Sequence, residues 1–592
     1  MERKFIAKKI HHDRKVYFMK KLTLPVTSGM RFDIWLKRSR ENSSPLLQFS
    51  AGGEIIYAIK KAADYHQYFT YTHYSDQQLT IEWDEDAADI SLFYYWLPET
   101  LAQEGVTFLI SDTHTLYPVG RSKMVDWYSK ESLRPTLHFS PFINWMNDPN
   151  GLCKIDETYH LFYQYHPHST EWGPMHWGHA ASEDLYHWRH YPVFLQPEQN
   201  LEALGATGGA FSGTAFQERD GKLRFWFTER LPAYDLYKGY REVQKCATPG
   251  PWLDKVESVK QVLSELPAGV GCDFRDPKVW FDGERNHYFM LLGASVDGDP
   301  AALLFTSADS DEWTFDHVLW RADSHFREHG GRCVECPDFF SINGKWVLII
   351  GIVGYTEPQT GRHNLLYAQI GDFNSGRFTP DDKPLQTLDF GTDFYALQTF
   401  RDGQQILGFA WLYNWASKKS AASVYSGEMS LPRRFMLNNH GALCMQPLLP
   451  PEACVRQRTD HYQACQNGLL HLSVDRQQSF SLKLTGKDIS RLLLTLNGET
   501  GEQAELCYAE NWLTLRAEGH DEGQYGAYVE KIETLELFFD AGIVEVFANE
   551  GSHCGTRRYF HLSCCNELTL KYNSSAQITT ARLTQYRSIW EQ

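Results

Sequence analysis

Apolar and polar residues alternate in short runs over much of the chain, beginning with the first 130 or so residues. The runs KVYFMKKLTL, RFDIWLK, QYFTYTHY and DISLFYYWL switch between apolar and polar positions at almost every step. A period of two puts successive side chains on opposite faces of an extended backbone, so each run predicts a half-buried β-strand. Residues 1–132 are therefore predicted to form an N-terminal β-rich accessory module.

From HFSPFINWMNDPNG onward the pattern changes to short strands, Gly and Asp turns and frequent Trp. Two stretches, 181–196 and 306–320, share a Ser, acidic residues, a Trp and an apolar end. Polar residues recur at intervals of 64, 64, 59 and 58, namely Asp148, Ser212, Asp276, Glu335 and Asp393. A strand-rich unit of this length suits one four-stranded propeller blade. Residues 133–445 are predicted to form a five-bladed β-propeller whose equivalent positions all face the central axis.

The last part of the chain follows a Pro-bearing linker, CMQPLLPPEACV (444–455). Alternating runs such as SFSLKLTG, RLLLTLNG and TLELFFDAGIVEVFANEG are separated by Gly or Asn turns. This pattern predicts a β-sandwich over 446–592, and FFDAGIVEVFANEG is predicted to be a hairpin that turns at Asp-Ala-Gly. The fold class is therefore all-β, with three modules.

Size and charge narrow the function. A chain of 592 residues, 42% of them hydrophobic, is too long for one core and implies two to four domains. Aromatic residues make up 14%, which suits either sugar-stacking sites or a large β-rich core. The formal net charge is −17 and no basic stripe is present, which argues against nucleic acid and anionic membranes as partners.

The cysteines and the chain start bear on compartment and metals. The basic start has no apolar run of signal-peptide length, and no stretch approaches the 18 apolar residues of a membrane span. The 12 Cys are irregularly spaced, which indicates reduced thiols and not a disulfide framework. We expect a cytoplasmic protein. CVEC (333–336) lacks a second ligand pair, and the crowded His residues of 160–190 lack H-E-x-x-H. We therefore expect no metal and no cofactor.

Three acidic residues lie in Pro-marked contexts: Asp148 in NDPNG, Asp276 in FRDPKVW and Glu335 in VECPDFF. Any one of them alone is most simply a turn residue, but three at blade-like spacing favour a shared site. Glycoside cleavage needs one ionised carboxylate and one protonated carboxyl group, and a third anion would favour the cation-like transition state. Arg275 is a candidate to bind a hydroxyl or steady a carboxylate, unless it forms only a surface ion pair.

These segments resemble glycoside hydrolase family 32, the invertase and fructan-hydrolase family. WMNDPNG, FSGT (211–214), FRDPKVW, ECPDFF and DFYALQTF (393–400) match its successive motifs in order, and the resemblance covers about 137–592. It implies a five-bladed propeller followed by a β-sandwich. It also implies a retaining, metal-independent β-fructofuranosidase that acts on terminal fructosyl units of a small sugar substrate.

By the same resemblance, Asp148 is similar to the nucleophile, Glu335 to the general acid/base and Asp276 to the transition-state stabiliser. The positions that resemble the family's sugar pocket are Trp145, Asn147, Gln164, Trp172, Phe211, Ser212, Arg275 and Trp411. For the aromatic members, core packing is the alternative interpretation.

The sequence departs from the family pattern in two places. Residues 1–132 have no counterpart in its simplest members, and self-association through this or the C-terminal module is left open. Tyr425 stands where relatives usually have a Trp. For the nearby Lys418 and Lys419, the two interpretations are binding of a substrate phosphate and simple exposure to solvent. Sucrose, sucrose-6-phosphate and short fructo-oligosaccharides all remain candidate substrates. A non-catalytic fructoside-binding propeller, a transfructosylating enzyme and an inverting hydrolase remain alternatives.

Overall fold

The computed structural model describes residues 19–40, 45–111, 116–233, 239–412, 415, 423–461, 468–475, 479–517, 525–573 and 577–591. Within these residues no helix is long and apolar enough to cross a membrane. The chain forms two compact units: one contains Met1–Pro98 and Thr107–Val119, and the other contains Glu99–Val106 and Gly120–Gln592. The predicted module boundaries at 132/133 and 445/446 stay predictions.

The smaller unit consists of two antiparallel sheets around one apolar core. The four-stranded sheet has the order β1 (Met19–Val26), β6 (Gln77–Asp84), β3 (Leu47–Ala51) and β4 (Glu54–Ile59). The five-stranded sheet has the order β5 (Gln67–Thr72), β2 (Arg31–Arg38), β7 (Ala88–Trp96), β8 (Thr107–Ser111) and β9 (Leu116–Val119). Phe32, Phe49 and Phe93 are fully or almost fully buried between them, as the alternating runs predicted.

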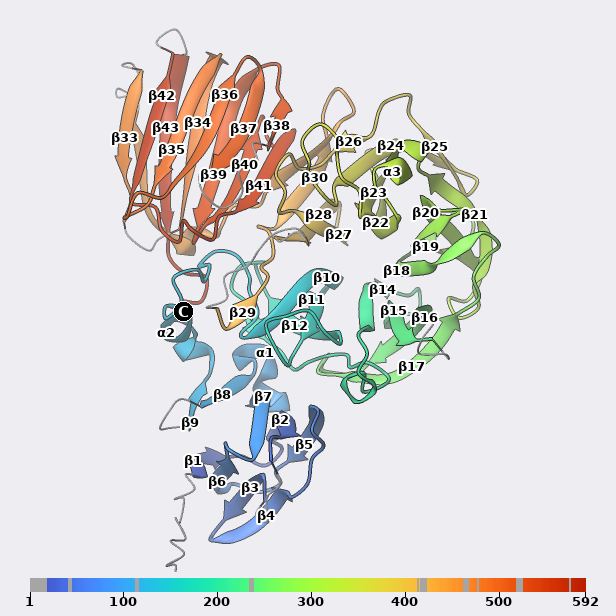
Figure 1. Ribbon diagram of the computed structural model, residues 1–592, viewed down its shortest axis with the longest axis vertical. Coiled ribbons are helices and arrows are strands. Elements are labelled where there is room, and N and C mark those ends of the chain that lie inside the picture. The colour runs from blue at the N-terminus through green and yellow to red at the C-terminus, as the bar shows by residue number, and fades with distance from the viewer. Residues whose placement is uncertain are drawn as a thin grey trace, which may run out of the picture. The chain divides into compact units, whose positions relative to one another are not determined.

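The larger unit begins with a propeller of five sheets (Figure 1). The first sheet contains β10 (Asn144–Ile155), β11 (Thr158–His166), β12 (His176–Ser182) and β13 (Arg189–His190). The second contains β14 (Gly209–Gln217), β15 (Leu223–Pro232), β16 (Tyr240–Pro249) and β17 (Val256–Leu263). The third contains β18 (Val270–Asp282), β19 (His287–Val296), β20 (Asp299–Ser307) and β21 (Thr314–Arg321).

The remaining two sheets complete the ring. The fourth contains β22 (Cys333–Ile342), β23 (Lys345–Val353), β24 (Leu366–Asn374), β25 (Arg377–Pro380) and β26 (Gln386–Thr387). The fifth contains β27 (Tyr395–Asp402), β28 (Gln405–Trp411), β30 (Arg433–Leu437) and β31 (Leu443–Pro447). The short strand β29 (Tyr425–Ser426) then pairs in parallel with β10, which joins the end of the ring to its start.

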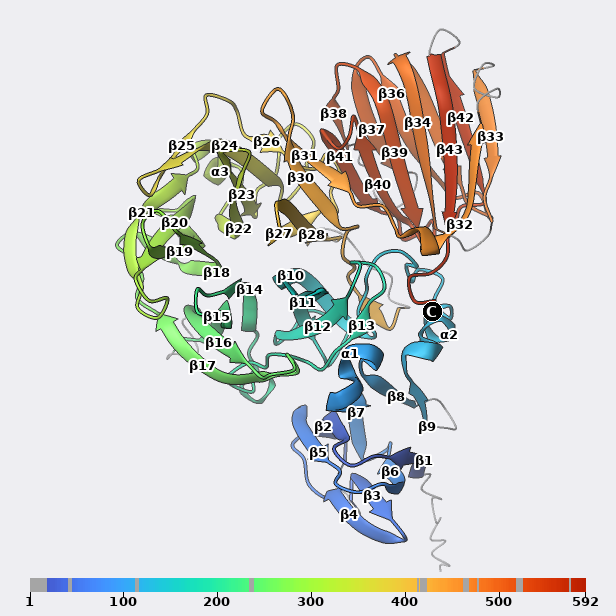
Figure 2. The same ribbon diagram turned by 180° about the vertical axis from the view of Figure 1, so that it is seen from behind.

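The C-terminal part of this unit is a sandwich of two six-stranded sheets (Figure 2). One sheet has the order β32 (Val455–His461), β43 (Gln577–Tyr586), β34 (Phe480–Ile489), β39 (Ile532–Asp540), β40 (Ile543–Ala548) and β41 (His553–Arg558). The other has the order β33 (Leu469–Ser473), β42 (Glu567–Tyr572), β35 (Arg491–Asn497), β36 (Gln503–Ala509), β37 (Trp512–Ala517) and β38 (Tyr525–Tyr528). The predicted hairpin is present: β39 and β40 turn through Ala541 and Gly542, both with positive φ.

Helix is limited to α1 (Leu101–Glu104), α2 (Met124–Tyr128), α3 (Ser324–Glu328) and a few single 3-10 turns within the described residues. The predicted all-β architecture, a propeller followed by a β-sandwich and preceded by a β-rich module, is confirmed.

Candidate active site

The first strand of each propeller sheet lies at the centre of the ring (Figure 1). These strands contact one another in succession: β10 contacts β14, β14 contacts β18, β18 contacts β22, β22 contacts β27, and β27 contacts β10. Each of these strands shifts register against its neighbour: between Met146 and Pro149, Ala210 and Gly213, Arg275 and Lys278, Glu335 and Asp338, and Tyr395 and Gln398. A second shift occurs in β10, between Asn150 and Cys153, and in β18, between Val270 and Phe274. The five shifts named first are β-bulges, which re-aim side chains.

Proline explains three of the five bulges. Pro149, Pro277 and Pro337 have no N–H to donate to the ladder, so the regular pairing ends there. Asp276 and Cys336, the residues before two of these prolines, have φ of 64° and 45°. The Pro-marked acids of the sequence therefore lie at or directly before the register shifts of β10, β18 and β22.

One expected member of this set lies elsewhere. Asp393 was expected at the axial place of the fifth blade, but it precedes β27 and its Oδ2 accepts the backbone N–H of Arg558, on the sandwich strand β41, at 3.0 Å. The fifth bulge begins instead after Tyr395, where Ala396 has φ of 52°. The interval of 58 was therefore misleading, because it linked an interface carboxylate to a series of bulges.

Asp148 lies at the bulge of β10 and is half-buried. Its Oδ2 accepts the Ser212 hydroxyl at 2.7 Å, and its Oδ1 accepts the Asn147 amide at 3.0 Å. Burial raises the pKa of Asp148, the donated hydrogen bonds lower it, and the charge of Glu335 raises it again. Asn147 is itself held by the Trp145 indole N–H at 2.8 Å. Asp148 is thus a carboxylate with a set orientation.

Asp276 and Asp148 share one neighbour, Cys336. The Cys336 backbone N–H donates to Asp276 Oδ2 at 2.8 Å, and its Sγ lies 3.6 Å from Asp148 Oδ2. Burial raises the pKa of Asp276 to about 8, against the pull of Arg275 and with the added repulsion of Glu335 and Asp148. Cys336, at the bulge of β22, therefore connects Asp148 and Asp276, and the third acid, Glu335, directly precedes Cys336 in the chain.

Glu335 is held by two donors. Arg275 Nη2 donates to its Oε1 at 2.9 Å and the Tyr395 hydroxyl donates to its Oε2 at 2.8 Å. Arg275 is also bound by Asp273 at 2.6 Å and by Glu242 at 3.3 Å. This guanidinium is 4% exposed, so its charge acts on Glu335 with little screening. Tyr395 and Cys336 were not among the predicted site residues; the bulge spacing of 60 residues would have indicated both.

The predicted aromatic residues form a cluster beside the acids. Trp145 is 5% exposed and its ring lies 6.0 Å from Trp411 and 5.9 Å, stacked, from Trp415. Trp172 and Phe211 have ring centroids 6.3 Å apart, and Trp172 is also 6.3 Å from Trp415. Trp411 is completely buried, whereas Trp415, which the sequence did not indicate, is 43% exposed. Lys418 and Lys419 lie outside the described residues.

Gln164 is brought to the same blades but faces the backbone. Its side chain on β11 is 2% exposed, and its Nε2 donates to the Ala210 carbonyl of β14 at 2.9 Å. Gln164 thereby links the first two blades beside Ser212. Tyr425, the noted departure, is also buried and donates to Glu428 and to the Leu133 carbonyl, each at 2.8 Å.

Clustered acids at the centre of a propeller that carries a β-sandwich define the class of propeller-fold glycoside hydrolases. The match to family models is more specific. The "Glycosyl hydrolases family 32 N-terminal domain" matches residues 138–447 and the "Glycosyl hydrolases family 32 C terminal" domain matches 471–587. The chain belongs to glycosyl hydrolase family 32.

Individual relatives agree with this assignment. The chain is 38% identical over 327 residues to a sucrose-6-phosphate hydrolase of Zymomonas mobilis, and the aligned region covers 53% of this chain and 60% of that protein. It is 30% identical over 461 residues to the raffinose invertase of Escherichia coli, covering 75% and 92%. The family 32 structure from Bifidobacterium adolescentis superposes with a TM-score of 0.83 at 23% identity, over 97% of this chain and 100% of that one, and so shares the fold.

Proposed function

We propose that the chain is a retaining, exo-acting β-fructofuranosidase that hydrolyses terminal non-reducing β-D-fructofuranosides by double displacement. The observation that carries this proposal is the connection of Asp148, Asp276 and Glu335 through Cys336 and Arg275 at the ring centre. The relatives named sucrose-6-phosphate hydrolase and raffinose invertase support a sucrose-type substrate. Sucrose, sucrose-6-phosphate and short fructo-oligosaccharides are the proposed candidates.

Asp148 is the proposed nucleophile. Attack by one of its oxygens on the anomeric carbon of the fructosyl unit breaks the bond to the leaving oxygen and forms a covalent ester. The Ser212 and Asn147 donors favour the ionised form and set the direction of its lone pairs. The partly exposed position leaves an oxygen accessible to the sugar.

Glu335 is the proposed general acid and base. It donates a proton to the leaving oxygen in the first step and takes one from water in the second, so that the attacking hydroxide releases fructose and restores Asp148. Arg275 and Tyr395 hold its two oxygens, which keeps the carboxyl group in one orientation through both steps. Metal is not needed for either proton transfer.

Asp276 is the proposed transition-state stabiliser. The carboxyl group is buried and bound by the Cys336 N–H, so it is preorganised and costs little to orient. Hydrogen bonds from the fructosyl hydroxyls would favour its ionised form and place negative charge near the developing oxocarbenium ion. Trp145, Trp172, Phe211 and Ser212 are proposed to surround the sugar, and Trp411 to support Trp145 from behind.

The test is a substrate panel of sucrose, sucrose-6-phosphate, kestose, inulin and levan, with free fructose as the readout. Asp148→Ala should reduce turnover by about four orders of magnitude or more while leaving the unfolding temperature close to that of the parent. Asp220→Asn, an acid in an exposed turn of the second blade, is the matched control. Near-normal turnover in Asp148→Ala would contradict the proposed nucleophile.

Two further readouts separate the alternatives. Proton NMR of the first-released fructose anomer should show retention, because two successive displacements at the anomeric carbon each invert it. Inversion would require another arrangement. Sucrose binding by calorimetry without fructose release would indicate a binding propeller, and fructosyl transfer exceeding release at high sucrose would indicate a transferase. A cytoplasmic location is proposed as well, and the eleven free thiols of the described chain fit a reducing compartment.

A further inference from the structure

A cavity of about 520 Å³ lies where the outer strands of the propeller meet the sandwich. Its walls come from residues 362–390 and 438–442 of the fourth and fifth blades and from β37, β38 and the start of β41. None of its walls belongs to β10, β14, β18 or β22, and Figure 1 places β26 and β38 at the rim of the ring, away from its centre. We call this cavity the rim cleft. It is separate from the candidate active site.

Two exposed aromatic rings mark the sandwich side of the rim cleft. Trp512 and Tyr528 are opposite each other in the β37–β38 register, with ring centroids 6.3 Å apart. They are 52% and 55% exposed, although their neighbours Leu513 and Leu515 are buried in the sandwich core. An exposed Trp beside an exposed Tyr forms an apolar surface that the C–H face of a ligand can cover.

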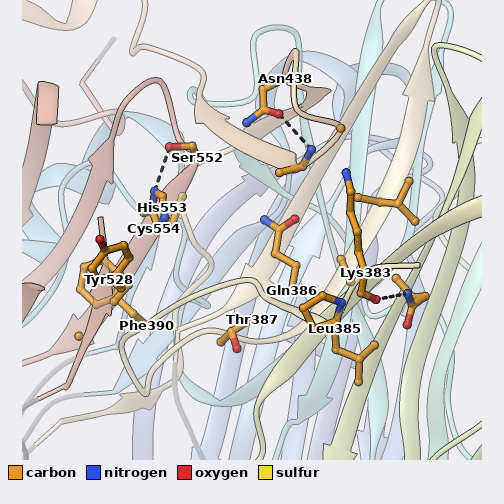
Figure 3. A pocket seen from close by; sticks show the side chains of 18 of the residues that line it. Lys383, Leu385, Gln386, Thr387, Phe390, Asn438, Tyr528, Ser552, His553 and Cys554 are labelled. Atoms are coloured by element: carbon orange, nitrogen blue, oxygen red, sulfur yellow. Dashed lines mark hydrogen bonds between the residues drawn. The ribbon is translucent and has the colours of Figure 1, made fainter. Parts of the chain in front are cut away.

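Polar groups with unused hydrogen-bonding capacity line the same cleft (Figure 3). The His553 ring uses Nδ1 to contact the Ser552 hydroxyl at 3.0 Å, and Nε2 makes no hydrogen bond to the described residues. Burial lowers the pKa of His553, which favours the neutral ring. Thr387 is exposed on the propeller side, and its hydroxyl likewise has no partner in the described chain.

Two of the three charged side chains that line the rim cleft are paired with an opposite charge, and the third, Lys383, donates its Nζ to the His440 carbonyl at 2.6 Å. Arg362 is bound bidentately by Glu357, at 3.0 and 2.8 Å, and Asp381 accepts Lys345 at 2.8 Å. Aromatic rings and hydrogen-bonding groups outnumber charged groups in this lining, so a neutral ligand rich in hydroxyl groups fits the cleft. Sugars combine apolar C–H faces with hydroxyl groups, and a volume of this size is within the range of small-ligand sites.

The cleft is also rigid, because backbone hydrogen bonds join its two sides. Phe390 N donates to the Cys554 carbonyl at 2.7 Å and Thr556 N donates to Asp389 at 2.8 Å. Met445 N donates to the Gly551 carbonyl at 2.9 Å. The walls are thus held in place before any ligand arrives, which lowers the entropic cost of binding.

We propose that the rim cleft is a second carbohydrate-binding site that holds part of a fructan or fructo-oligosaccharide chain. Trp512 and Tyr528 stack on sugar rings, and His553 and Thr387 bind hydroxyl groups. The proposal rests on the proposed function for the choice of sugar. Its role is to retain long substrates on the enzyme, so the KM for fructans depends on the cleft and the KM for sucrose does not.

The binding test uses full-length protein that carries Asp148→Ala and inulin oligosaccharides of about ten units as the probe. Calorimetry should give two sites per chain, and a further Trp512→Ala or Tyr528→Ala change should leave one. Thr387→Trp fills the cleft from the propeller side and should have the same effect without altering the sandwich. Trp252→Ala removes another exposed Trp, 48% accessible, and should retain both sites. Equal stoichiometry in all these proteins would overturn the proposal.

The kinetic test uses the active protein. Trp512→Ala should raise KM for inulin about fivefold, as expected for the loss of one aromatic stack, with kcat/KM for sucrose unchanged. An equal KM for inulin in parent and variant would contradict retention by the cleft. Failure of the proposed function would appear differently: the parent would release no fructose from any substrate, while the calorimetric comparison would still report on the cleft.

Discussion

The hydrogen bond from Ser212 to Asp148 offers a quantitative test of how the proposed nucleophile is kept ionised. Ser212 is 2% exposed and donates at 2.7 Å to the Oδ2 of a carboxylate whose pKa burial raises. Ser212→Ala removes this donor and leaves Asn147 as the main remaining one. The pKa of Asp148 should therefore rise further, because the ionised form loses more than the protonated form.

The size of the effect follows from the hydrogen-bond energy. A bond to a charged group contributes about 1.5–3 kcal/mol, and 1.36 kcal/mol corresponds to one pKa unit. Because Asp148 keeps some solvent contact, the lower end applies, and a rise of about one unit is expected. Since the nucleophile must be ionised, the acidic limb of kcat/KM against pH should move about one pH unit toward neutrality.

The assay is fructose release from sucrose between pH 3 and 9, with kcat/KM fitted at each pH. Ser212→Thr retains the hydroxyl and should keep the parent limb. Ser182→Ala removes another buried Ser that donates to a carboxylate, Asp184 at 3.1 Å, outside the site. The plateau rate reports any lost sugar contact separately. An acidic limb in Ser212→Ala that coincides with that of the parent would refute the reasoning.

Three stability measurements probe other parts of the structure. Burial raises the pKa of Asp276 to about 8, so the folded state loses stability relative to the unfolded state as pH rises from about 4 to 8. Asp276→Asn should therefore raise the melting temperature at pH 8 and change it little at pH 4. Equal changes at the two pH values would contradict this. Burial would lower the pKa of His138, but the hydrogen bonds that its ring donates to Asp540 and Glu545, and the charges of these two carboxylates, raise it to about 9. The stability that His138 contributes is complete below about pH 6.5 and is lost as pH rises through about 9, so chemical denaturation should show this loss in the parent and not in His138→Gln. Gly391→Ala would put a Cβ 1.9 Å from the Thr556 carbonyl oxygen and should reduce the free energy of unfolding by about 1–3 kcal/mol. Gly283→Ala has open space around the new Cβ and should leave the free energy of unfolding unchanged. Equal stability of the two variants would argue against the close packing.

Much of the site was visible in the chain because local chemistry dictated it. Alternating runs predicted strands, since a pleated strand must put one face in a core and the other outside. The Asp-Pro and Cys-Pro steps marked bulges, since proline cannot continue a ladder. The three acids, Ser212 and Arg275 were therefore predictable as candidates, and the family motifs added their expected roles.

The remaining features depend on which segments meet, and no local pattern encodes that. Tyr395 and Cys336 became site neighbours only because five bulges converge on one axis. Asp393 has blade-like spacing but binds the sandwich, where it accepts the backbone N–H of Arg558 on β41. Trp411 is closed off by packing while Trp415 is exposed, and the rim cleft exists only where the fourth and fifth blades face β37 and β38. The local sequence determined the strands and the available side-chain chemistry. Long-range packing decided which side chains lie together, because contacts between residues hundreds of positions apart form only in the folded chain.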